Sequence, residues 1–393
     1  MKINLAVFFG GRSVEHEISV ISAVQAMHAA NHEKYNVIPI YITKAGEMYT
    51  GEVLFDINNY KDLNALLENC QAAQIAKQEN EVVLITRGKG LFKSSKTTPI
   101  HMAFPVVHGT NCEDGSIQGF FELIGLPYIG CDVTSSAIGM DKSVFKSVMQ
   151  SYNLPVLPGF TFDSRSFVLQ KDEIIGKIAE QFSFPVIVKP ANLGSSVGIS
   201  KANDPQQLEE AITLAANFAE KILVEPAITN LREINCSVLG DNEEYEASVC
   251  EEPIMKDEIL SYKDKYLSGN STKGMESLSR KLPADLPDEK SEEIKQLAIN
   301  VFKAIGGSGL ARIDFLLDTA DNDKVYVNEI NTIPGSLAFY LWKESGLPFD
   351  KLIDKLVDLG YKRSRRKANL MYSIETNILA TSNFGIKGNK LKG

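Results

Sequence analysis

The segment KVYVNEINTIPGS (Lys324–Ser336) begins like a buried strand and then places a carboxylate and an amide where such a strand would avoid them. Successive side chains of an extended chain alternate between its two faces. Glu329 and Asn331 are therefore expected to continue the face that two valines begin. A polar pair at that position needs a reason, and the preceding sequence indicates one.

The stretch GLARIDFLLD (309–318) predicts a second strand just upstream of the first. The residues between the two strands, TADNDK, are rich in turn formers. A two-residue turn centred on Asp321 and Asn322 would join the strands as an antiparallel hairpin. Counting outward from that turn places Asp314 opposite Glu329.

The same register places Arg312 opposite Asn331. Two facing carboxylates in a half-buried sheet repel each other and are costly to desolvate. A divalent cation between Asp314 and Glu329 would remove both objections, and the oxygen ligands of Asp, Glu and Asn suit Mg²⁺. Two solvated edge strands that carry ordinary surface acids are the alternative for these residues taken alone.

Composition limits the class of protein. A chain of 393 residues predicts two or three domains. A net charge of −9 argues against nucleic acid as a partner. Five scattered cysteines without a CxxC pair argue against a disulfide framework and favour the cytoplasm. No apolar run is long enough to cross a bilayer, and the start MKINLAVFFGG is interpreted as a first strand, so no membrane association is expected.

The order of strand-like and helix-like segments predicts an α/β protein with several units. The first unit alternates strands and helices, which favours a Rossmann-like open parallel sheet. A long polar loop, 252–282, interrupts the third unit and is a candidate for a closing lid. The predicted units are 1–138, 139–225, 226–362 and a C-terminal extension of unassigned role, 363–393.

The stretch KPANLGSSVGISK, which begins at Lys189, combines a lysine with a glycine- and serine-rich turn. Glycines allow close approach of the backbone to a ligand, and successive amides can bind phosphate oxygens. The amides that would do so belong to Ser195, Ser196 and Val197. The spacing is not that of a Walker A loop, and a plain β-hairpin with a glycine turn explains the same letters equally well.

The stretch KILVEPAIT offers backbone groups to a planar base. The carbonyl of Pro226 can accept a hydrogen bond from an adenine amino group, because proline loses its donor but keeps its acceptor. The amide of Ile228 can donate to a ring nitrogen. A simple linker between domains is the alternative.

Taken together, these motifs resemble the ATP-grasp superfamily, and more closely the D-alanine–D-alanine ligases. The resemblance covers the chain up to about residue 362. It implies an ATP-grasp fold, α+β in its ATP-binding part, preceded by the Rossmann-like domain. The ordered motifs that carry it are GGRSVEHEIS (10–19), HGTNCEDGSIQG (108–119), GMDKSVFK (139–146), KPANLGSSVG (189–198), DKYLSG (264–269), ARIDF (311–315) and NEINTIPG (328–335).

The resemblance implies a role in nucleotide and metal binding for several residues. Two Mg²⁺ ions, with Mn²⁺ as a substitute, would be held by Asp314, Glu329 and Asn331. The phosphates of ATP would be neutralised by Lys142, Lys189 and Lys265. The adenine would contact Glu225, Pro226 and Ile228, and the ribose would contact Glu233.

The resemblance also implies the substrates and the residues around them. ATP and D-alanine would react through an acyl phosphate to give D-alanyl-D-alanine, in a homodimer. The residues near the first D-alanine and the lid would be Glu15, Ser195, Tyr266 and His108. The oxyanion would be stabilised by Arg312 and the Gly335 amide.

Three departures from the family pattern are visible. Cys112 replaces a glycine, and Pro226 replaces a frequent lysine. Tyr340 stands where the family has a serine that holds the carboxylate of the second substrate. Ser336 or the Tyr340 hydroxyl are the candidates to replace that serine.

Other functions stay open at this point. Another ATP-grasp carboxylate–amine ligase, or a ligase that uses D-serine or D-lactate as acceptor, would share the metal and lysine residues. A non-catalytic nucleotide-binding regulator would be expected to lose Arg312 or a metal ligand. A nicotinamide dehydrogenase fits least, because the Gly10-Gly11 turn lacks the G-x-G-x-x-G pattern.

Overall fold

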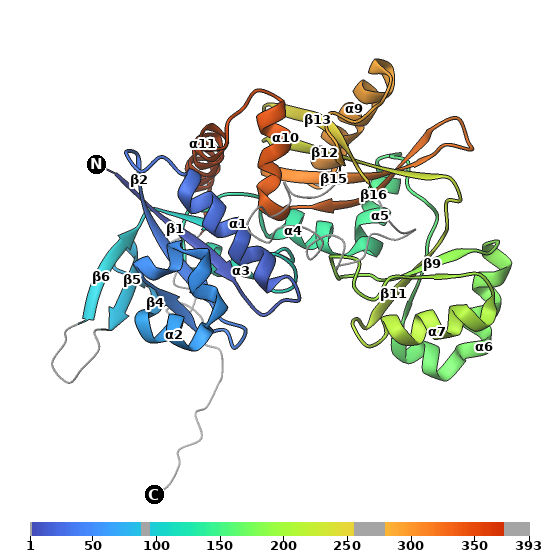
Figure 1. The fold of residues 1–393 in the computed structure, drawn as a ribbon, viewed down its shortest axis with the longest axis horizontal. Coiled ribbons are helices and arrows are strands. Elements are labelled where there is room, and N and C mark those ends of the chain that lie inside the picture. Colours follow the sequence, from blue (N-terminus) through green and yellow to red (C-terminus); the bar gives the residue numbers. More distant parts are fainter. Residues whose placement is uncertain (1, 88–94, 255–279, 373–393) are drawn as a thin grey trace, which may run out of the picture.

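A computed structural model describes residues 2–87, 95–254 and 280–372 of the chain. The described residues form three sheets with helices packed against them (Figure 1). The first sheet lies within residues 3–105, the second within 160–226, and the third within 231–331, and each sheet with its adjoining helices and connections is called the first, second or third unit below.

The first sheet has seven strands in the order β6-β5-β4-β3-β2-β1-β7. Only β2, β1 and β7 are parallel, and the other neighbours pair antiparallel. The predicted open parallel sheet is therefore limited to three strands, and antiparallel strands extend it beyond β2. The strands are β1 (Ile3–Gly10), β2 (Tyr35–Ile42), β3 (Met48–Thr50), β4 (Gln71–Gln78), β5 (Glu81–Arg87), β6 (Ser95–Ile100) and β7 (Met102–Pro105).

Helices surround this sheet and lead from it to the next. Helix α1 (His16–Ala29) follows the Gly10-Gly11 turn and packs on β1. Helix α3 (Ser116–Ile124) follows β7. The remaining helices are η1 (Glu52–Phe55), η2 (Ile57–Lys61), α2 (Leu63–Asn69), α4 (Val133–Met140) and α5 (Lys142–Ser151).

The last described helix, α11 (Phe349–Ala368), packs between the first and third units, where Leu352 and Leu356 share an apolar core with Leu5 and Leu310. It continues past residue 362, where the sequence predicts the end of the third unit. Arg363 in this continuation is buried, and its guanidinium donates to the carbonyls of Tyr128 and Gly130 in the first unit. Residues 373–393 of the predicted extension lie outside the described residues.

The second sheet is antiparallel in the order β10-β9-β11-β8. Two amphipathic helices cover it, and their apolar faces share one core with Val186, Val188 and Ile222. The elements are β8 (Phe160–Asp163), α6 (Ser164–Gln181), β9 (Val186–Pro190), β10 (Ser200–Ala202), α7 (Pro205–Ala215) and β11 (Lys221–Pro226).

The third sheet is antiparallel in the order β14-β13-β12-β15-β16. Helix α9 packs on one face, while α10 contacts β13. The elements are β12 (Leu231–Gly240), β13 (Tyr245–Pro253), β14 (Arg280–Lys281), α9 (Asp288–Ala304), β15 (Gly309–Asp318), β16 (Lys324–Asn331), η4 (Gly335–Ala338) and α10 (Phe339–Glu344).

The predicted register of the β15–β16 hairpin is correct at its functional end, where Asp314 pairs with Glu329. The predicted two-residue turn is wrong, because the pair nearest the turn is Asp318 with Lys324 and the connection spans 319–323. The Asp318 carboxylate accepts a hydrogen bond from the Ala320 amide and stabilises this longer turn.

A β-bulge at Asn328 compensates for the longer turn. Phe315 pairs with Val327, but Asp314 pairs with Glu329, so Asn328 is an additional residue in β16. Val327 joins the apolar core. Because the extra residue shifts the alternation of faces by one position, Glu329 points to the opposite face of the sheet. The expectation that Glu329 shares the face of the valines is therefore wrong.

Candidate active site

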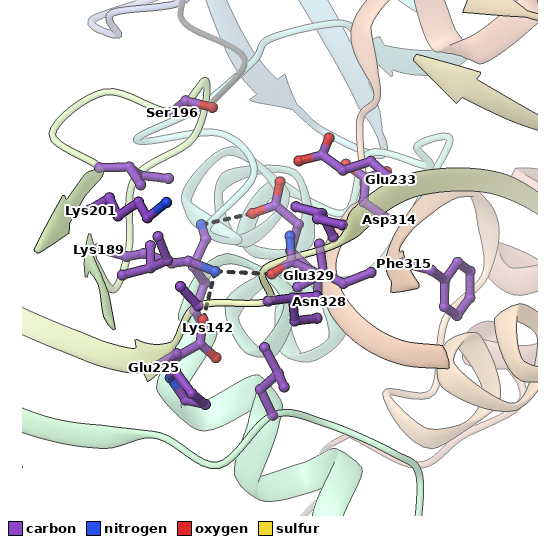
Figure 2. A pocket seen from close by; sticks show the side chains of 18 of the residues that line it. Lys142, Lys189, Ser196, Lys201, Glu225, Glu233, Asp314, Phe315, Asn328 and Glu329 are labelled. Carbon is purple, nitrogen blue, oxygen red and sulfur yellow. Dashed lines mark hydrogen bonds and ion pairs between the residues drawn. The ribbon is translucent and has the colours of Figure 1, made fainter. Parts of the chain in front are cut away.

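A cavity of about 230 Å³ lies between the second and third sheets (Figure 2). Strands β9 and β11 lie on one side of it, and β15 and β16 lie on the other (Figure 1). Of the predicted site residues, those that line it are Lys142, Lys189, Ser196, Glu225, Pro226, Ile228, Glu233, Asp314 and Glu329. These residues come from both sheets and from α5. The cavity therefore brings together side chains far apart in the sequence.

Other predicted residues lie outside the lining of this cavity. Asn331 and Arg312 contact the carboxylate of Asp314 from its side. Five further predicted site residues lie in the described part of the chain but do not line the cavity: Glu15, His108, Ser195, Val197 and Gly335. Lys265, Tyr266 and most of the predicted lid lie outside the described residues.

The wall of the cavity carries the paired acids that the sequence predicted. The Arg312 guanidinium donates to both oxygens of Asp314, at 2.6 Å from Nε and 2.7 Å from Nη2. The Nδ2 of Asn331 lies 3.1 Å from the same carboxylate. Glu329 forms an ion pair with Lys142 at 3.1 Å (Figure 2). The carboxylate of Asp314 is paired with Arg312, and that of Glu329 is paired with Lys142. A bound metal ion could take the place of either cation.

Lys142 is held in place at the start of α5. Asp141 caps this helix by accepting from the amides of Ser143 and Val144. The backbone amide of Lys142 donates to Ala191 at the end of β9, at 2.8 Å. Its ammonium donates to the Leu193 carbonyl, also at 2.8 Å. The helix start thus fixes this ammonium between the two sheets.

The floor of the cavity holds one buried carboxylate between two lysines. Glu225 forms ion pairs with Lys189, at 2.6 Å, and with Lys146. Burial works to raise the pKa of Glu225, but the two ammonium groups outweigh it and hold the pKa below its usual value. The carboxylate is directed into this ion cluster, whereas the sequence suggested that it would face an adenine.

The two lysines respond differently to the same carboxylate. Burial works against the charge of both, but Glu225 raises the pKa of Lys189, while the pKa of Lys146 stays lowered. Lys189 also donates to the side chain of Asn328, at 3.1 Å, across the cavity. One carboxylate compensates two ammonium groups, so the floor carries an excess of positive charge that suits phosphate.

Sequence reasoning missed three residues of this site. Lys146 lies four residues after Lys142 on α5, a spacing that places both on one helix face and could have indicated it. Lys201, on β10, lines the cavity and follows the glycine-rich turn. Asn328 reaches Lys189 only because of the bulge, for which the sequence gives no signal.

The residues present fit a divalent metal that is shared with phosphate oxygens. The charged residues that line the cavity are the lysines 142, 189 and 201 and the acids 225, 233, 314 and 329. Such a lining cannot neutralise a triphosphate by itself, so additional cations are required. In the described parts of the chain, no group of three or more His, Cys, Asp or Glu side chains could hold a metal alone. The paired carboxylates of Asp314 and Glu329 supply hard oxygen ligands for an ion that also binds phosphate.

The β9–β10 hairpin extends from the cavity to the first unit. Ser195 and Ser196 adopt left-handed backbone conformations, with φ of 56° and 57°. The Ser195 hydroxyl donates to Glu15 at the start of α1. A Cβ atom at Gly194 would lie 2.8 Å from a Glu15 oxygen, so glycine is required for this approach. Glu15 and Ser195, which were both predicted to lie near the first substrate, are therefore in contact.

His108 is fully buried between the first and third units. Its Nδ1 donates to the Ile333 carbonyl at 2.7 Å, and its Nε2 accepts from the Ser22 hydroxyl at 2.8 Å. Burial lowers the pKa of His108 to about 4, so the ring is neutral. Both ring nitrogens bind protein groups, and the predicted contact with a substrate carboxylate stays a prediction.

Glu113 bridges the same two units and was not singled out from the sequence. Its carboxyl group accepts from the amides of Gly109, at 2.8 Å, and Ile333, at 3.0 Å. Burial, aided by the charge of Glu15, raises the pKa of Glu113 to about 8. The neutral ring of His108 and the carboxyl group of Glu113 thus both connect the first unit with Ile333 of the third unit.

Three sheets with a cavity between the last two, lysines on its floor and paired acids on its wall define an ATP-grasp nucleotide-binding enzyme. The family described as D-ala D-ala ligase C-terminus matches residues 148–358, and the one described as D-ala D-ala ligase N-terminus matches residues 4–131. The chain belongs to the D-alanine–D-alanine ligase family, as the sequence motifs predicted, and is an ATP-dependent ligase.

Individual relatives agree with this assignment. A D-alanine–D-alanine ligase of Thermosipho melanesiensis is 40% identical over 377 residues, covering 96% of this chain and 98% of the relative. The solved D-alanine–D-alanine ligase of Coxiella burnetii is 30% identical, with a TM-score of 0.78, covering 93% of this chain and 96% of the other. The solved VanG D-Ala:D-Ser ligase of Enterococcus faecalis is also 30% identical, with a TM-score of 0.76, covering 92% of this chain and 100% of the other.

Proposed function

We propose that the protein joins two D-alanine molecules into D-alanyl-D-alanine for the synthesis of peptidoglycan precursors, with conversion of ATP to ADP and phosphate. The observation that carries the proposal is the pairing of Asp314 with Glu329 on the wall of the cavity, opposite the lysines of its floor. This arrangement suits a triphosphate whose terminal phosphoryl group is transferred to a carboxylate.

The reaction has two steps. In the first, the carboxylate of one D-alanine attacks the γ-phosphorus, the bond to the β-phosphate oxygen breaks, and an acyl phosphate forms. In the second, the amine of another D-alanine attacks the acyl carbon, loses a proton and expels phosphate. Activation is required because a carboxylate is a poor electrophile, and correct positioning accounts for much of the rate.

The chain's own cations would bind the phosphates. Lys142 and Lys189 lie at the cavity and would contact the α- and β-phosphates, with Lys265 as the proposed partner of the γ-phosphate. The amides of Ser196 and Val197 would add hydrogen bonds from the hairpin. The backbone of Pro226 and Ile228 would hold the adenine, with Glu225 beneath them, and Glu233 would bind the ribose.

Two Mg²⁺ ions, or Mn²⁺ in their place, would be held by Asp314, Glu329 and Asn331. When bound, such ions neutralise phosphate charge and orient the transferred group. Arg312 would then turn part of its fork from Asp314 toward the developing oxyanion, together with the Gly335 amide. The pairing of Arg312 with Asp314 holds the guanidinium at that place beforehand.

The first D-alanine would bind next to the contact between Glu15 and Ser195. The Glu15 carboxylate would pair with the ammonium of the substrate, while Ser195 and Tyr266 would close over it. His108 would lie beside the substrate carboxylate. We further propose a cytoplasmic homodimer that binds neither nucleic acid nor membrane; no described helix is long and apolar enough to cross a bilayer.

Product analysis tests this function. The protein is incubated with ATP, Mg²⁺ and D-alanine, alone and with competing D-serine or D-lactate, and the products are identified by mass spectrometry. We expect D-alanyl-D-alanine as the main product in every mixture. If the main product contained D-serine, the protein would use the same acceptor as the similar VanG D-Ala:D-Ser ligase. If the protein bound nucleotide without releasing ADP, the proposed ligase activity would be rejected.

A further inference from the structure

A row of polar side chains crosses the third sheet from the metal-binding pair to its other edge. In register across four neighbouring strands lie Glu329 on β16, Asp314 on β15, Asn235 on β12 and Glu251 on β13. Neighbouring strands are about 4.8 Å apart. The row therefore leads from the cavity toward Glu251 in steps comparable to the span of one amino acid.

Glu251 is the centre of a buried cluster at the far end of this row. It is only 2% exposed. Its Oε1 accepts hydrogen bonds from Asn235, at 3.1 Å, and from the Tyr340 hydroxyl, at 2.8 Å. Its Oε2 accepts from Nη1 of Arg280, at 2.7 Å. Three different strands and helix α10 thus converge on one carboxylate.

Arg280 is oriented by this cluster. The carbon of its guanidinium lies 4.1 Å from the centre of the Tyr340 ring, so the planar group stacks on the ring. The bond to Glu251 fixes one edge of the fork, and the stacking fixes its plane. An arginine held in this way is suited to bind a second carboxylate along another edge.

Tyr340 is held in its protonated form in this cluster. Burial and then Glu251 raise the pKa of its hydroxyl, which donates to Glu251. Arg312, which belongs to the proposed oxyanion site, lies on β15 two residues before Asp314. The row of polar side chains therefore begins beside the reacting end of the site and ends at the buried cluster.

Of the two residues that the sequence suggested for the acceptor carboxylate, Tyr340 already donates its hydroxyl to Glu251. The other, Ser336, is buried and offers a neutral hydroxyl. A cation is also a stronger partner than a hydroxyl for a carboxylate in a buried site.

We propose that Arg280 binds the carboxylate of the acceptor amino acid, with Glu251 and Tyr340 as the positioning residues that orient its guanidinium. This inference rests on the proposed ligation and adds the residue that recognises the acceptor. The amine of the acceptor is one carbon away from its carboxylate. A carboxylate on Arg280 would therefore direct the amine back along the row toward Arg312 and the acyl carbon.

The experiment compares two acceptors that differ only in the charge recognised. D-alaninamide keeps the amine but has no carboxylate, so it can act as an acceptor and not as a donor. The protein is incubated with ATP, Mg²⁺ and D-alanine in competition with D-alaninamide, and both products are measured. We expect the wild type to prefer D-alanine, and Arg280→Gln to lose at least tenfold of that preference through a higher KM for the acceptor.

Matched variants separate recognition from folding. Arg232→Gln removes another arginine of the third sheet, which binds Glu252 at 2.9 Å, and should keep the preference. Glu251→Gln should raise the acceptor KM more than it lowers kcat. Arg280→Lys keeps the charge without the fork and should retain part of the preference, and it replaces Arg280→Gln if that variant does not fold.

A separate readout follows the donor. With hydroxylamine present, the acyl phosphate of D-alanine is trapped as a hydroxamate without any acceptor carboxylate. Arg280→Gln should still form the hydroxamate at a rate near that of the wild type. If it does and the preference for D-alanine over D-alaninamide is unchanged, the role of Arg280 is wrong; if the wild type forms no hydroxamate, the proposed function itself is wrong.

Discussion

Two glutamates in the same cavity have opposite surroundings. Glu329, on the wall, has a side chain that is 22% exposed and is paired with Lys142 at 3.1 Å. Glu225, on the floor, has a side chain that is 1% exposed and lies between Lys189 and Lys146. The sequence assigned both to nucleotide or metal binding.

The difference separates a binding role from a structural one. Glu329 is partly exposed and Lys142 has a second partner in the Leu193 carbonyl, so this ion pair can exchange for ligand atoms at little cost. A fully buried ion cluster is different, because removing one member leaves the others charged without compensation. Glu329 is therefore expected to serve chemistry and Glu225 to hold the floor, which makes two kinds of mutational effect predictable.

Glu329→Gln gives the largest expected effect, on turnover. The amide keeps the size of the side chain but removes the charge that would bind a metal ion next to the phosphates. We expect ADP release to fall by roughly a thousandfold or more, a loss comparable to removal of a transition-state partner. The free energy of unfolding should change much less than in a fully buried cluster, because the Glu329 side chain is 22% exposed and Lys142 keeps its bond to the Leu193 carbonyl.

The control for this variant is Glu252→Gln. Glu252 is adjacent to Glu251 on β13 and pairs with Arg232, away from the cavity lining. It should keep nearly full activity in the same ADP assay. Near-normal turnover in Glu329→Gln would contradict the role given to the paired acids.

Glu225→Gln gives the next effect, on stability. The substitution leaves the ammonium groups of Lys189 and Lys146 buried without their carboxylate. Breaking such a pair costs about 3–5 kcal/mol. Urea unfolding followed by circular dichroism would measure the loss of unfolding free energy.

An exposed pair of the same residue types provides the control. Lys44 and Glu17 form an ion pair on the surface of the first unit, with both side chains more than half exposed. Glu17→Gln should cost less than about 1 kcal/mol in the same measurement. If Glu225→Gln were equally mild, the floor cluster would not be structural and the contrast between the two glutamates would fail.

Sequence reasoning succeeded where a motif places side chains by local geometry. The strand alternation of β15 and the register of its hairpin located Asp314 opposite Glu329, although the predicted turn was wrong. The longer turn and the bulge at Asn328 shift the register in opposite directions and cancel at the site. Such a bulge depends on the packing of Val325 and Val327 into the core, so the amino-acid sequence alone does not predict it.

Sequence reasoning was weaker where contacts join distant segments. The direction of the Glu225 side chain depends on two lysines that lie 36 and 79 residues away in the chain. The cluster of Glu251, Arg280 and Tyr340 joins residues from two strands and a helix, with no periodic pattern. Helix α11 likewise joins Leu5 of the first unit and Leu310 of the third in one apolar core, a contact that no local sequence pattern predicts.

Unlike the two glutamates, His108 is a buried group that carries no charge. Its pKa is lowered to about 4 by burial, whereas an unfolded histidine titrates near 6.5. As the pH falls below about 6.5, the unfolded chain gains a proton that the folded chain does not, so the free energy of unfolding decreases. The loss from this group should reach about 3 kcal/mol near pH 4, since one pKa unit is about 1.4 kcal/mol.

The measurement must be a difference, because Glu113 acts in the opposite direction. Its raised pKa makes the folded chain hold a proton that the unfolded chain has lost, so its contribution to stability increases as the pH falls from about 8. Subtracting the pH dependence of His108→Gln from that of the wild type removes this common term. The difference curve should slope downward only below about pH 6.5. A flat difference curve for His108→Gln would mean that the His108 ring gains its proton as readily in the folded protein as in the unfolded chain.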